Sequence, residues 1–305
     1  MTFCEVNTGG ASHRIWYEVS GAAEEDAKHR MLFTMGLGSD SRLWKIQVDY
    51  FSKLPGYRVC TYDNRGIGFS DPVPGRWTTR EMAQDALALM DHLGWQKDVN
   101  LVGTSMGGMI TLEIACQDIP RFASVTLAST IAGGIPSLLY FATVLHSGLY
   151  KLVRLAAAQT QDERGKWFLS CLFPDEFVKL EDEAHPGQSN ADSLQQYFLD
   201  VTKEEPGREQ VTGTTFIKQC FAAATHSVSS SKLRNLGESV SVLVLTGDVD
   251  IVVPPANSER LAREIPNCHF LKVSGAGHGV LMQNREFTNQ AIQSLIERQP
   301  IRTEP

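Results

Sequence analysis

The sequence lacks the charge patterns that accompany several classes of partner. It has 35 acidic and 28 basic residues in 305, a formal net charge of −7, with neither a basic cluster nor an acidic tail. Nucleic acids and anionic membranes are bound mainly through basic patches, so we expect no nucleic-acid partner. A small molecule, neutral or apolar, is the expected substrate.

Long hydrophobic runs are also missing. The longest apolar stretch, residues 138–150, is too short and too interrupted to cross a bilayer. The first residues show neither the basic patch nor the apolar run of a signal peptide, and no Asn-x-Ser/Thr sequence occurs. We therefore expect no membrane span and a cytoplasmic location.

Cysteines are few and scattered. Several of the six lie inside apolar strand or helix patterns, which is typical of buried free thiols rather than of a disulfide framework. Cys268-His269 is too isolated for a metal site, and no phosphate loop or dinucleotide fingerprint is present. We expect a protein that needs no metal and no organic cofactor.

The most informative stretch is residues 100–110, where a strand pattern passes into a helix pattern through Gly-x-Ser-x-Gly. Gly103 and Gly107 leave room on both sides of Ser105, which a sharp strand-to-helix turn needs because strand and helix come close together there. The pentapeptide alone is common in ordinary loops. Between a strand and a helix, it predicts that Ser105 is a nucleophile.

Strand and helix patterns alternate on both sides of a helical segment. Strands are expected at residues 13–20, 31–35, 57–62, 98–102, 122–128, 241–246 and 268–273. Helices are expected between them at 42–53, 79–92, 255–264 and 285–298, and after Ser105. From 131 to 239 the alternation stops, and helix patterns at 138–159, 163–172, 192–202 and 214–225 are separated by prolines.

This order predicts an α/β fold, a mostly parallel twisted sheet flanked by helices, with an inserted all-helical cap. We expect residues 1–130 and 239–305 to form the core and residues 131–238 to form the cap.

A serine hydroxyl is a weak nucleophile at neutral pH, so it needs a histidine to accept its proton and an acid to orient that histidine. Asp250 follows the strand at 241–246, and His278 follows the strand at 268–273. Both loops leave the sheet edge that carries Ser105. Asp248 is the alternative acid, and a turn-forming aspartate is the alternative role for Asp250.

Four motifs, in this order and context, resemble the α/β-hydrolase superfamily with a helical cap. They are Gly103-x-Ser105-x-Gly107, Gly247-x-x-Asp250-x-x-x-Pro254, Gly277-His278 and Asp63-x-Arg65-Gly66-x-Gly68-x-Ser70. The resemblance implies a triad of Ser105, Asp250 and His278. Pro254 lies where the family pattern has it, which favours Asp250 over Asp248.

The resemblance also implies an oxyanion hole made by the backbone N–H groups of Leu37 and Met106. Relatives commonly carry His-Gly after the strand at 31–35, whereas this chain carries Met35-Gly36. Gly36 and Gly38 are therefore alternative residues facing inward.

The substrate pocket has less specific candidates. Gly36 and Gly38 belong to the glycine loop, and Trp44 follows it; loop and tryptophan resemble those of enol-lactone hydrolases. His146 lies in the cap. Cap aromatics are candidates as well, with ordinary packing as the alternative: Tyr140, Phe141, Tyr150, Trp167, Phe168 and Phe221.

Together these features predict a serine hydrolase, a monomer or homodimer, that cleaves a small, largely apolar ester or lactone through an acyl-enzyme. The same triad can support C–C bond hydrolysis, acyl transfer or perhydrolysis. A ligand receptor that retains the triad is the alternative from another class, because fold does not fix function. Chain length and the absence of an appended domain favour the enzyme.

Overall fold

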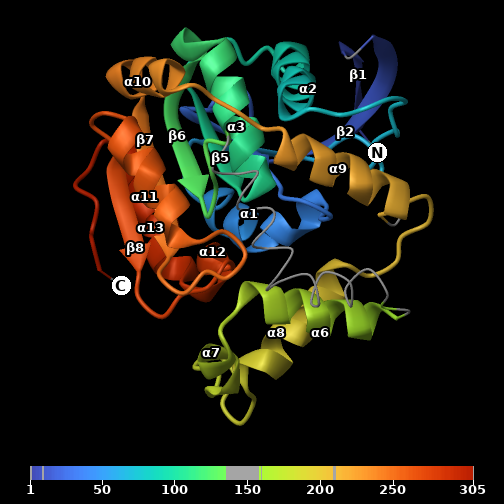
Figure 1. The fold of residues 1–305 in the computed structure, drawn as a ribbon, viewed down its shortest axis with the longest axis vertical. Helices are drawn as coiled ribbons and strands as arrows, with labels where there is room; N and C mark the ends of the chain where they lie inside the picture. The colour runs from blue at the N-terminus through green and yellow to red at the C-terminus, as the bar shows by residue number, and fades with distance from the viewer. Residues whose placement is uncertain (1, 9, 135–157, 159, 209–210, 305) are drawn as a thin grey trace.

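The fold is built on one eight-stranded sheet, seen in a computed structural model that describes residues 2–8, 10–134, 158, 160–208 and 211–304 (Figure 1). The strand order is β1-β2-β4-β3-β5-β6-β7-β8, so the termini lie at opposite edges of the sheet. The strands are β1 (Thr2–Thr8), β2 (Ala11–Gly21), β3 (His29–Thr34), β4 (Tyr57–Tyr62), β5 (Val99–Thr104), β6 (Phe122–Ala128), β7 (Ser241–Gly247) and β8 (His269–Val273). All pairs from β4 to β8 in this order are parallel, while β2 is antiparallel to both β1 and β4.

Helices cover both faces of this sheet. The helices outside the insertion are η1 (Ser41–Trp44), α1 (Lys45–Phe51), α2 (Thr79–His92), α3 (Met106–Gln117), η2 (Ile119–Arg121), α11 (Pro255–Glu264), α12 (Val280–Gln283) and α13 (Arg285–Ile296). The described residues between β6 and β7 form α6 (Gln161–Leu172), α7 (Asp175–Lys179), α8 (Asn190–Val201), α9 (Gly213–Ala224) and α10 (Ser230–Ser239). In Figure 1, α6, α7 and α8 form a layer below the sheet, and α9 returns the chain toward it.

Local sequence explains where these elements begin and how deeply they lie. Five of the six residues of β5 are buried, as expected for a parallel strand covered on both faces, so this strand runs through the middle of the core. At the start of α2, Thr78 Oγ1 accepts from the Glu81 N–H at 3.1 Å, and the Glu81 carboxylate accepts from the Thr78 N–H at 2.9 Å. This capping box fixes the first turn of the helix.

Two hydrophobic clusters fill the space on the two faces. One packs α2, α3 and α11 against the sheet, and the other packs α1 and α13 against the opposite face. Helix α9 adds Ala222 and Ala223 to the first cluster, and α8 adds Phe198 and Val201 to the second. The insertion is therefore anchored on both sides of the sheet.

The predicted fold class is confirmed by the sheet and its helices. Helices α6, α8 and α9 lie within two residues of their predicted limits. The helix predicted at 138–159 lies outside the described residues. Strand β1 and helices α7, α10 and α12 were not predicted. Strand β1 is a polar edge strand, and α7 and α12 are single turns. Helix α10 lies in the interval assigned to the cap but packs on α3 and α11.

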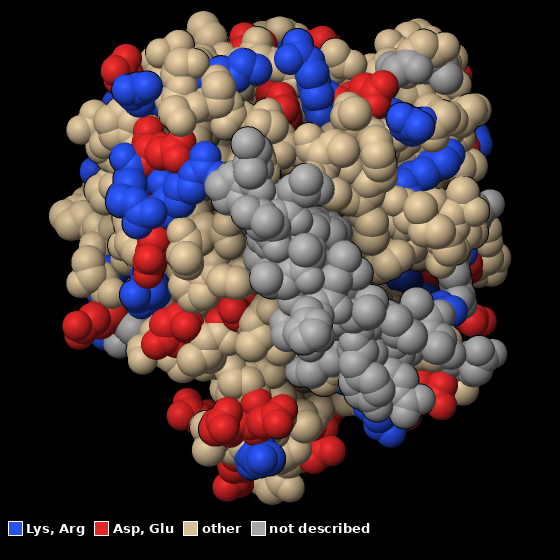
Figure 2. Space-filling view, in the orientation of Figure 1, with Lys and Arg blue, Asp and Glu red and all other residues tan. Residues whose placement is uncertain are grey.

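None of the helices in the described ranges is long and apolar enough to cross a membrane. Figure 2 shows basic and acidic side chains interspersed over the upper part of one face. Acidic side chains gather at its lower end, in the region of α7. No single sign of charge covers this face.

The strand order defines where a ligand can bind. From β3 the chain adds β4 on one side and β5 on the other. Such a reversal opens a crevice outside the carboxyl ends of the strands. The loops after β3 and β5 meet at this point.

A buried histidine lies where the insertion rejoins the core. His226, 2% exposed, follows α9, and its Nδ1 lies 2.9 Å from Thr79 Oγ1 of α2. Its carbonyl accepts from the Gly134 N–H at 3.0 Å. Burial lowers the pKa of His226 from 6.5 to about 4, so the ring is neutral at pH 7.

This depressed pKa predicts acid sensitivity. Between pH 6.5 and pH 4 the unfolded chain binds a proton at His226 that the folded chain does not, so the free energy of unfolding should fall by roughly 3 kcal/mol over this range. The variant His226→Asn, which keeps a polar group near Nδ1, should show a smaller fall in the free energy of unfolding as the pH decreases. Urea titrations at pH 7, 5.5 and 4 measure this fall. His269→Asn, at an exposed position on β8, is the control and should show the wild-type dependence on pH. An equal fall in the free energy of unfolding in wild type and His226→Asn would contradict the depressed pKa of His226.

Candidate active site

Loops from four parallel strands meet around one cavity of about 500 Å³. Ser105 follows β5, the glycine loop 36–39 follows β3, and the loops with Asp250 and His278 follow β7 and β8. Ser105 and His278 both line the cavity. The insertion closes the opposite side with side chains from α6, α8 and α9.

Ser105 occupies a strained turn between β5 and α3. Its backbone has φ 56° and ψ −125°, in a region that side-chain-bearing residues rarely adopt. A Cβ on Gly107 would lie 2.1 Å from the Thr34 carbonyl oxygen, and one on Gly103 would lie 2.3 Å from Thr111 Oγ1. The two motif glycines are therefore needed where β3 and α3 approach the turn.

His278 is held by a carboxylate. Its Nδ1 lies 2.8 Å from Asp250 Oδ2, and the two side chains are 8% and 0% exposed. Asp250 Oδ1 accepts from the N–H groups of Val252 and Val253, each at 2.8 Å. Since Nδ1 is engaged by the carboxylate, Nε2 is the ring nitrogen left for proton exchange in the cavity.

The alternative acid, Asp248, has different neighbours. It is exposed, and its Oδ1 accepts from the Gly275 N–H at 2.7 Å. It thus braces the turn after β8. Of the two aspartates, Asp250 is the one that contacts His278.

The glycine loop passes directly beside Ser105. A Cβ on Gly36 would lie 3.2 Å from Ser105 Cβ and 3.3 Å from the Thr104 carbonyl oxygen, so a side chain there would crowd the nucleophile. Leu37 lines the cavity, and Met106 begins α3 next to Ser105. The N–H groups of Leu37 and Met106 donate no hydrogen bond to another described residue.

The predicted pocket residues divide into three groups. Gly36, Gly38, Trp44 and Phe168 line the cavity. Tyr140 and His146, with Phe141 and Tyr150, lie outside the described residues. Trp167 and Phe221 do not line it.

The surface of α6 explains the position of Trp167. The helix directs one face into the cavity, and Trp167 lies to the side of that face; the lining residues are Gln161, Arg164, Phe168, Cys171 and Leu172. Sequence periodicity alone does not say which helix face the core will cover. Phe198 of α8 and Phe216 of α9 also line the cavity and were not predicted.

A buried ion pair joins the insertion to the loop after β4. Arg208 lies 2.9 Å from Asp63 Oδ2, and its guanidinium lies 4.2 Å from the centre of the Phe69 ring. Asp63 Oδ1 also accepts from the Ser41 N–H and hydroxyl at 3.0 and 2.7 Å. Burial raises the pKa of Asp63, and Arg208 opposes that rise. The Asp63 loop therefore braces its neighbours.

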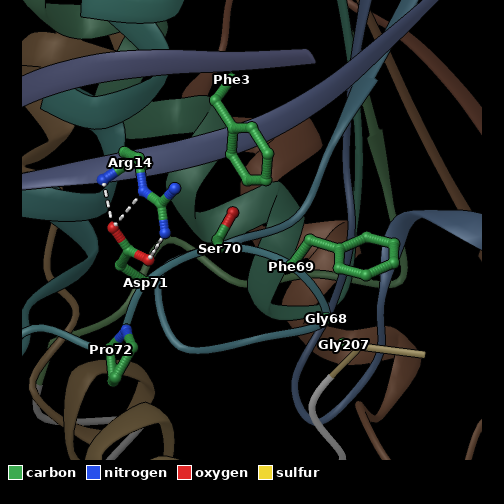
Figure 3. A pocket seen from close by; sticks show the side chains of 8 residues that line it. All are labelled: Phe3, Arg14, Gly68, Phe69, Ser70, Asp71, Pro72 and Gly207. Carbon is green, nitrogen blue, oxygen red and sulfur yellow. Dashed lines mark hydrogen bonds and ion pairs between the residues drawn. The ribbon is translucent and has the colours of Figure 1, made fainter. Parts of the chain in front are cut away.

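A second cavity, of about 220 Å³, is lined by residues 68–72 together with Phe3, Arg14 and Gly207 (Figure 3). At its wall Arg14 donates to both Asp71 carboxylate oxygens, at 3.0 and 2.9 Å. Ser70 is engaged structurally: its hydroxyl donates to the Asp63 carbonyl at 2.6 Å and accepts from the Trp16 N–H at 2.9 Å. This cavity offers no activated nucleophile among its described residues.

A sequence model of the alpha/beta hydrolase fold matches residues 30–285. The chain belongs to the α/β-hydrolase family. Membership of this family supports hydrolase activity and confirms the family resemblance predicted from the sequence.

Named relatives extend along the whole chain. It is 26% identical over 298 residues to RutD of Caulobacter vibrioides, provisionally named a carbamate hydrolase, and the match covers 95% of this chain and 98% of that protein. It is 25% identical over 286 residues to 3-oxoadipate enol-lactonase 2 of Acinetobacter baylyi, covering 92% of each. A thermophilic esterase from Thermogutta terrifontis has a similar structure, with TM-score 0.72, 24% identity and coverage of 98% and 99%. At this identity the structural similarity shows the fold alone.

Within the described ranges, no group of three or more His, Cys, Asp or Glu side chains is placed to hold a metal ion. The six cysteines are free.

The strain at Ser105 predicts an unusual order of stabilities. At an ordinary site glycine destabilises by roughly 0.5–1 kcal/mol relative to alanine. At Ser105, where φ is positive, Ser105→Gly should equal or exceed Ser105→Ala in free energy of unfolding, because glycine relieves a strain of about 1–3 kcal/mol. Urea unfolding measures both variants, and Ser231→Gly and Ser231→Ala on α10 serve as the matched pair with the ordinary order. The ordinary order at Ser105 as well would refute a strained turn.

Proposed function

We propose that the protein is a serine hydrolase that cleaves a small, largely apolar ester or lactone through an acyl-enzyme intermediate. One observation carries this proposal: Ser105, on a strained turn, lines the same cavity as His278, whose Nδ1 is bound by the buried Asp250. Nucleophile, base and orienting acid thus come from the ends of β5, β8 and β7, at one edge of the same sheet.

The mechanism assigns one role to each group. Ser105 Oγ attacks the carbonyl carbon while His278 Nε2 takes the hydroxyl proton, and Asp250 stabilises the resulting imidazolium. The N–H groups of Leu37 and Met106 donate to the oxyanion. His278 then gives its proton to the departing alkoxide, leaving an acyl-serine. Water, deprotonated by His278, releases the acid and restores Ser105.

The cavity supports a small substrate with an apolar part. Its volume, about 500 Å³, is in the range typical of small-molecule sites. Apolar side chains from both parts of the chain line it, among them Leu43, Phe168, Phe198, Phe216 and Leu281. The name of the enol-lactonase relative agrees with a lactone, a cyclic ester. A carbamate presents the same kind of carbonyl and is the second candidate, from the name of RutD.

We also propose that the core and the cap supply different parts of the active site. Residues 1–130 and 239–305 supply the triad and the glycine loop, and residues 131–238 supply the opposite wall through Arg164, Phe168 and Phe216. A monomer or homodimer in the cytoplasm remains a prediction.

The covalent step is tested by labelling. A fluorophosphonate should add one phosphonyl group to Ser105, because only an activated serine reacts rapidly. Peptide mass spectrometry locates the adduct, and Ser105→Ala is the control. Labelling of another serine, or labelling that persists in Ser105→Ala, excludes Ser105 as nucleophile. Hydrolysis of ester, lactone and carbamate panels by wild type then identifies the substrate class.

The acid is tested by Asp250→Asn. The amide oxygen can keep both backbone hydrogen bonds from Val252 and Val253, which places the amide NH₂ against His278 Nδ1. That ring nitrogen must then accept, so Nε2 carries the proton and cannot take one from Ser105. We expect kcat to fall by about four orders of magnitude in a folded protein.

Asp248→Asn is the matched control, since its amide oxygen can still accept from the Gly275 N–H. It should keep kcat within about 3-fold of wild type, because this side chain does not contact His278. Thermal melts of both variants separate lost catalysis from lost folding. Near-normal kcat in folded Asp250→Asn would remove Asp250 from the triad.

A further inference from the structure

A cap side chain reaches the glycine loop beside Ser105. Gln219 of α9 is completely buried, and its Oε1 accepts from the Gly38 N–H at 2.8 Å. Phe216, nearly one turn earlier on α9, lies 3.5 Å from where a Cβ on Gly38 would be. The two side chains hold α9 against the loop that follows β3.

Among the described residues, the core makes side-chain hydrogen bonds to this loop at its two ends, while Leu37 packs against the first hydrophobic cluster. Asn64 Nδ2 donates to the Met35 carbonyl at 3.0 Å, before the first glycine. Asp63 Oδ1 accepts from the Ser41 N–H at 3.0 Å, beyond the second glycine. Gly38 lies between these points with φ +70°, a conformation that glycine adopts freely. Within the described part of the chain, the hydrogen bond from Gln219 is therefore the polar contact that holds the middle of the loop.

The polarity of Gln219 is unfavourable by itself. Only Oε1 can accept from an N–H, so the orientation of the amide is fixed, and Nε2 is left buried without a partner among the described residues. An unsatisfied buried donor costs about 1–3 kcal/mol. An apolar residue of similar size would avoid that cost, and it would leave the Gly38 N–H without its acceptor.

We propose that Gln219 is a positioning residue that sets the oxyanion hole from the cap. The Gly38 N–H belongs to the peptide unit immediately after Leu37, so anchoring it limits rotation of Leu37 and keeps the Leu37 N–H directed at the developing oxyanion. Gln219 does not line the cavity, so it acts through the loop rather than by contact with a substrate. Packing of α9 against the core thereby completes the oxyanion hole. This inference rests on the proposed function.

The main test is Gln219→Met, which keeps the volume and removes the acceptor. With p-nitrophenyl butyrate as substrate we expect kcat to fall about 10-fold, less than the loss of an oxyanion donor itself, and KM to stay within about 2-fold. The affinity of phenylboronic acid, which forms a tetrahedral adduct with the serine, should fall in proportion to kcat. Gln219→Glu keeps an acceptor for Gly38 and should recover most of the kcat.

The matched control is Gln195→Met. Gln195 Nε2 donates to the Asp162 carbonyl and carboxylate at 2.9 and 3.0 Å, so its amide joins two cap helices without reaching the glycine loop. It should keep wild-type kcat and boronate affinity. If Gln219→Met does not fold, Gln219→Asn replaces it, because its shorter amide cannot reach Gly38 and should give the same fall.

The outcomes separate this inference from the proposed function. Wild-type kcat in Gln219→Met, an equal fall in Gln195→Met, or a fall in kcat without a fall in boronate affinity overturns the role of Gln219. Wild-type protein whose Ser105 resists the fluorophosphonate overturns the proposed function instead.

Discussion

The backbone at Ser105 can keep its strained conformation only because three strands hold it. The Ser105 N–H donates to the Ala128 carbonyl of β6 at 2.9 Å, and Thr130 Oγ1, just beyond β6, donates to the Ser105 carbonyl at 2.7 Å. On the other side the backbone of Gly107 passes so close to Thr34 of β3 that no side chain fits. The turn cannot relax without displacing both neighbours of β5. A nucleophile so held is preorganised by the sheet rather than by its own loop.

The cap is attached by two kinds of contact with different physical consequences. Phe198 and Val201 contribute to the hydrophobic cluster under α1 and α13, which supplies non-directional stabilisation. The Arg208–Asp63 pair and the Gln219–Gly38 hydrogen bond are directional and buried. Buried polar pairs add little net stability compared with apolar packing, but breaking one leaves an unpaired group and is strongly unfavourable. The polar contacts therefore define where the cap sits, while the apolar ones hold it there.

How far the sequence predicts this molecule depends on whether a feature is local. Apolar alternation and the Gly-x-Ser-x-Gly turn are local, so most core strands, the helix after Ser105 and the family were predicted, and Asp250 and His278 were predicted from strand-end position and motif order. Strand β1 was not predicted because a polar edge strand lacks a strong hydrophobic pattern. The residues that line the cavity could not be selected from the sequence, because they depend on which face of a cap helix meets the core. Phe168 faces the cavity and its neighbour Trp167 does not. The Gln219 contact joins positions 181 residues apart and has no sequence signal.

The insertion also shapes how the chain must fold. Strands β6 and β7 are parallel neighbours, yet about 110 residues separate the end of one from the start of the other. During synthesis β1 to β6 are complete well before β7 emerges, so β6 remains an unpaired edge with free backbone groups. Such an edge can pair with another nascent chain. Pairing of β7 with β6 closes this edge. It also brings the loops of Asp250 and His278 to Ser105 and so completes the site. Aggregation through β6 and formation of the active site are therefore mutually exclusive.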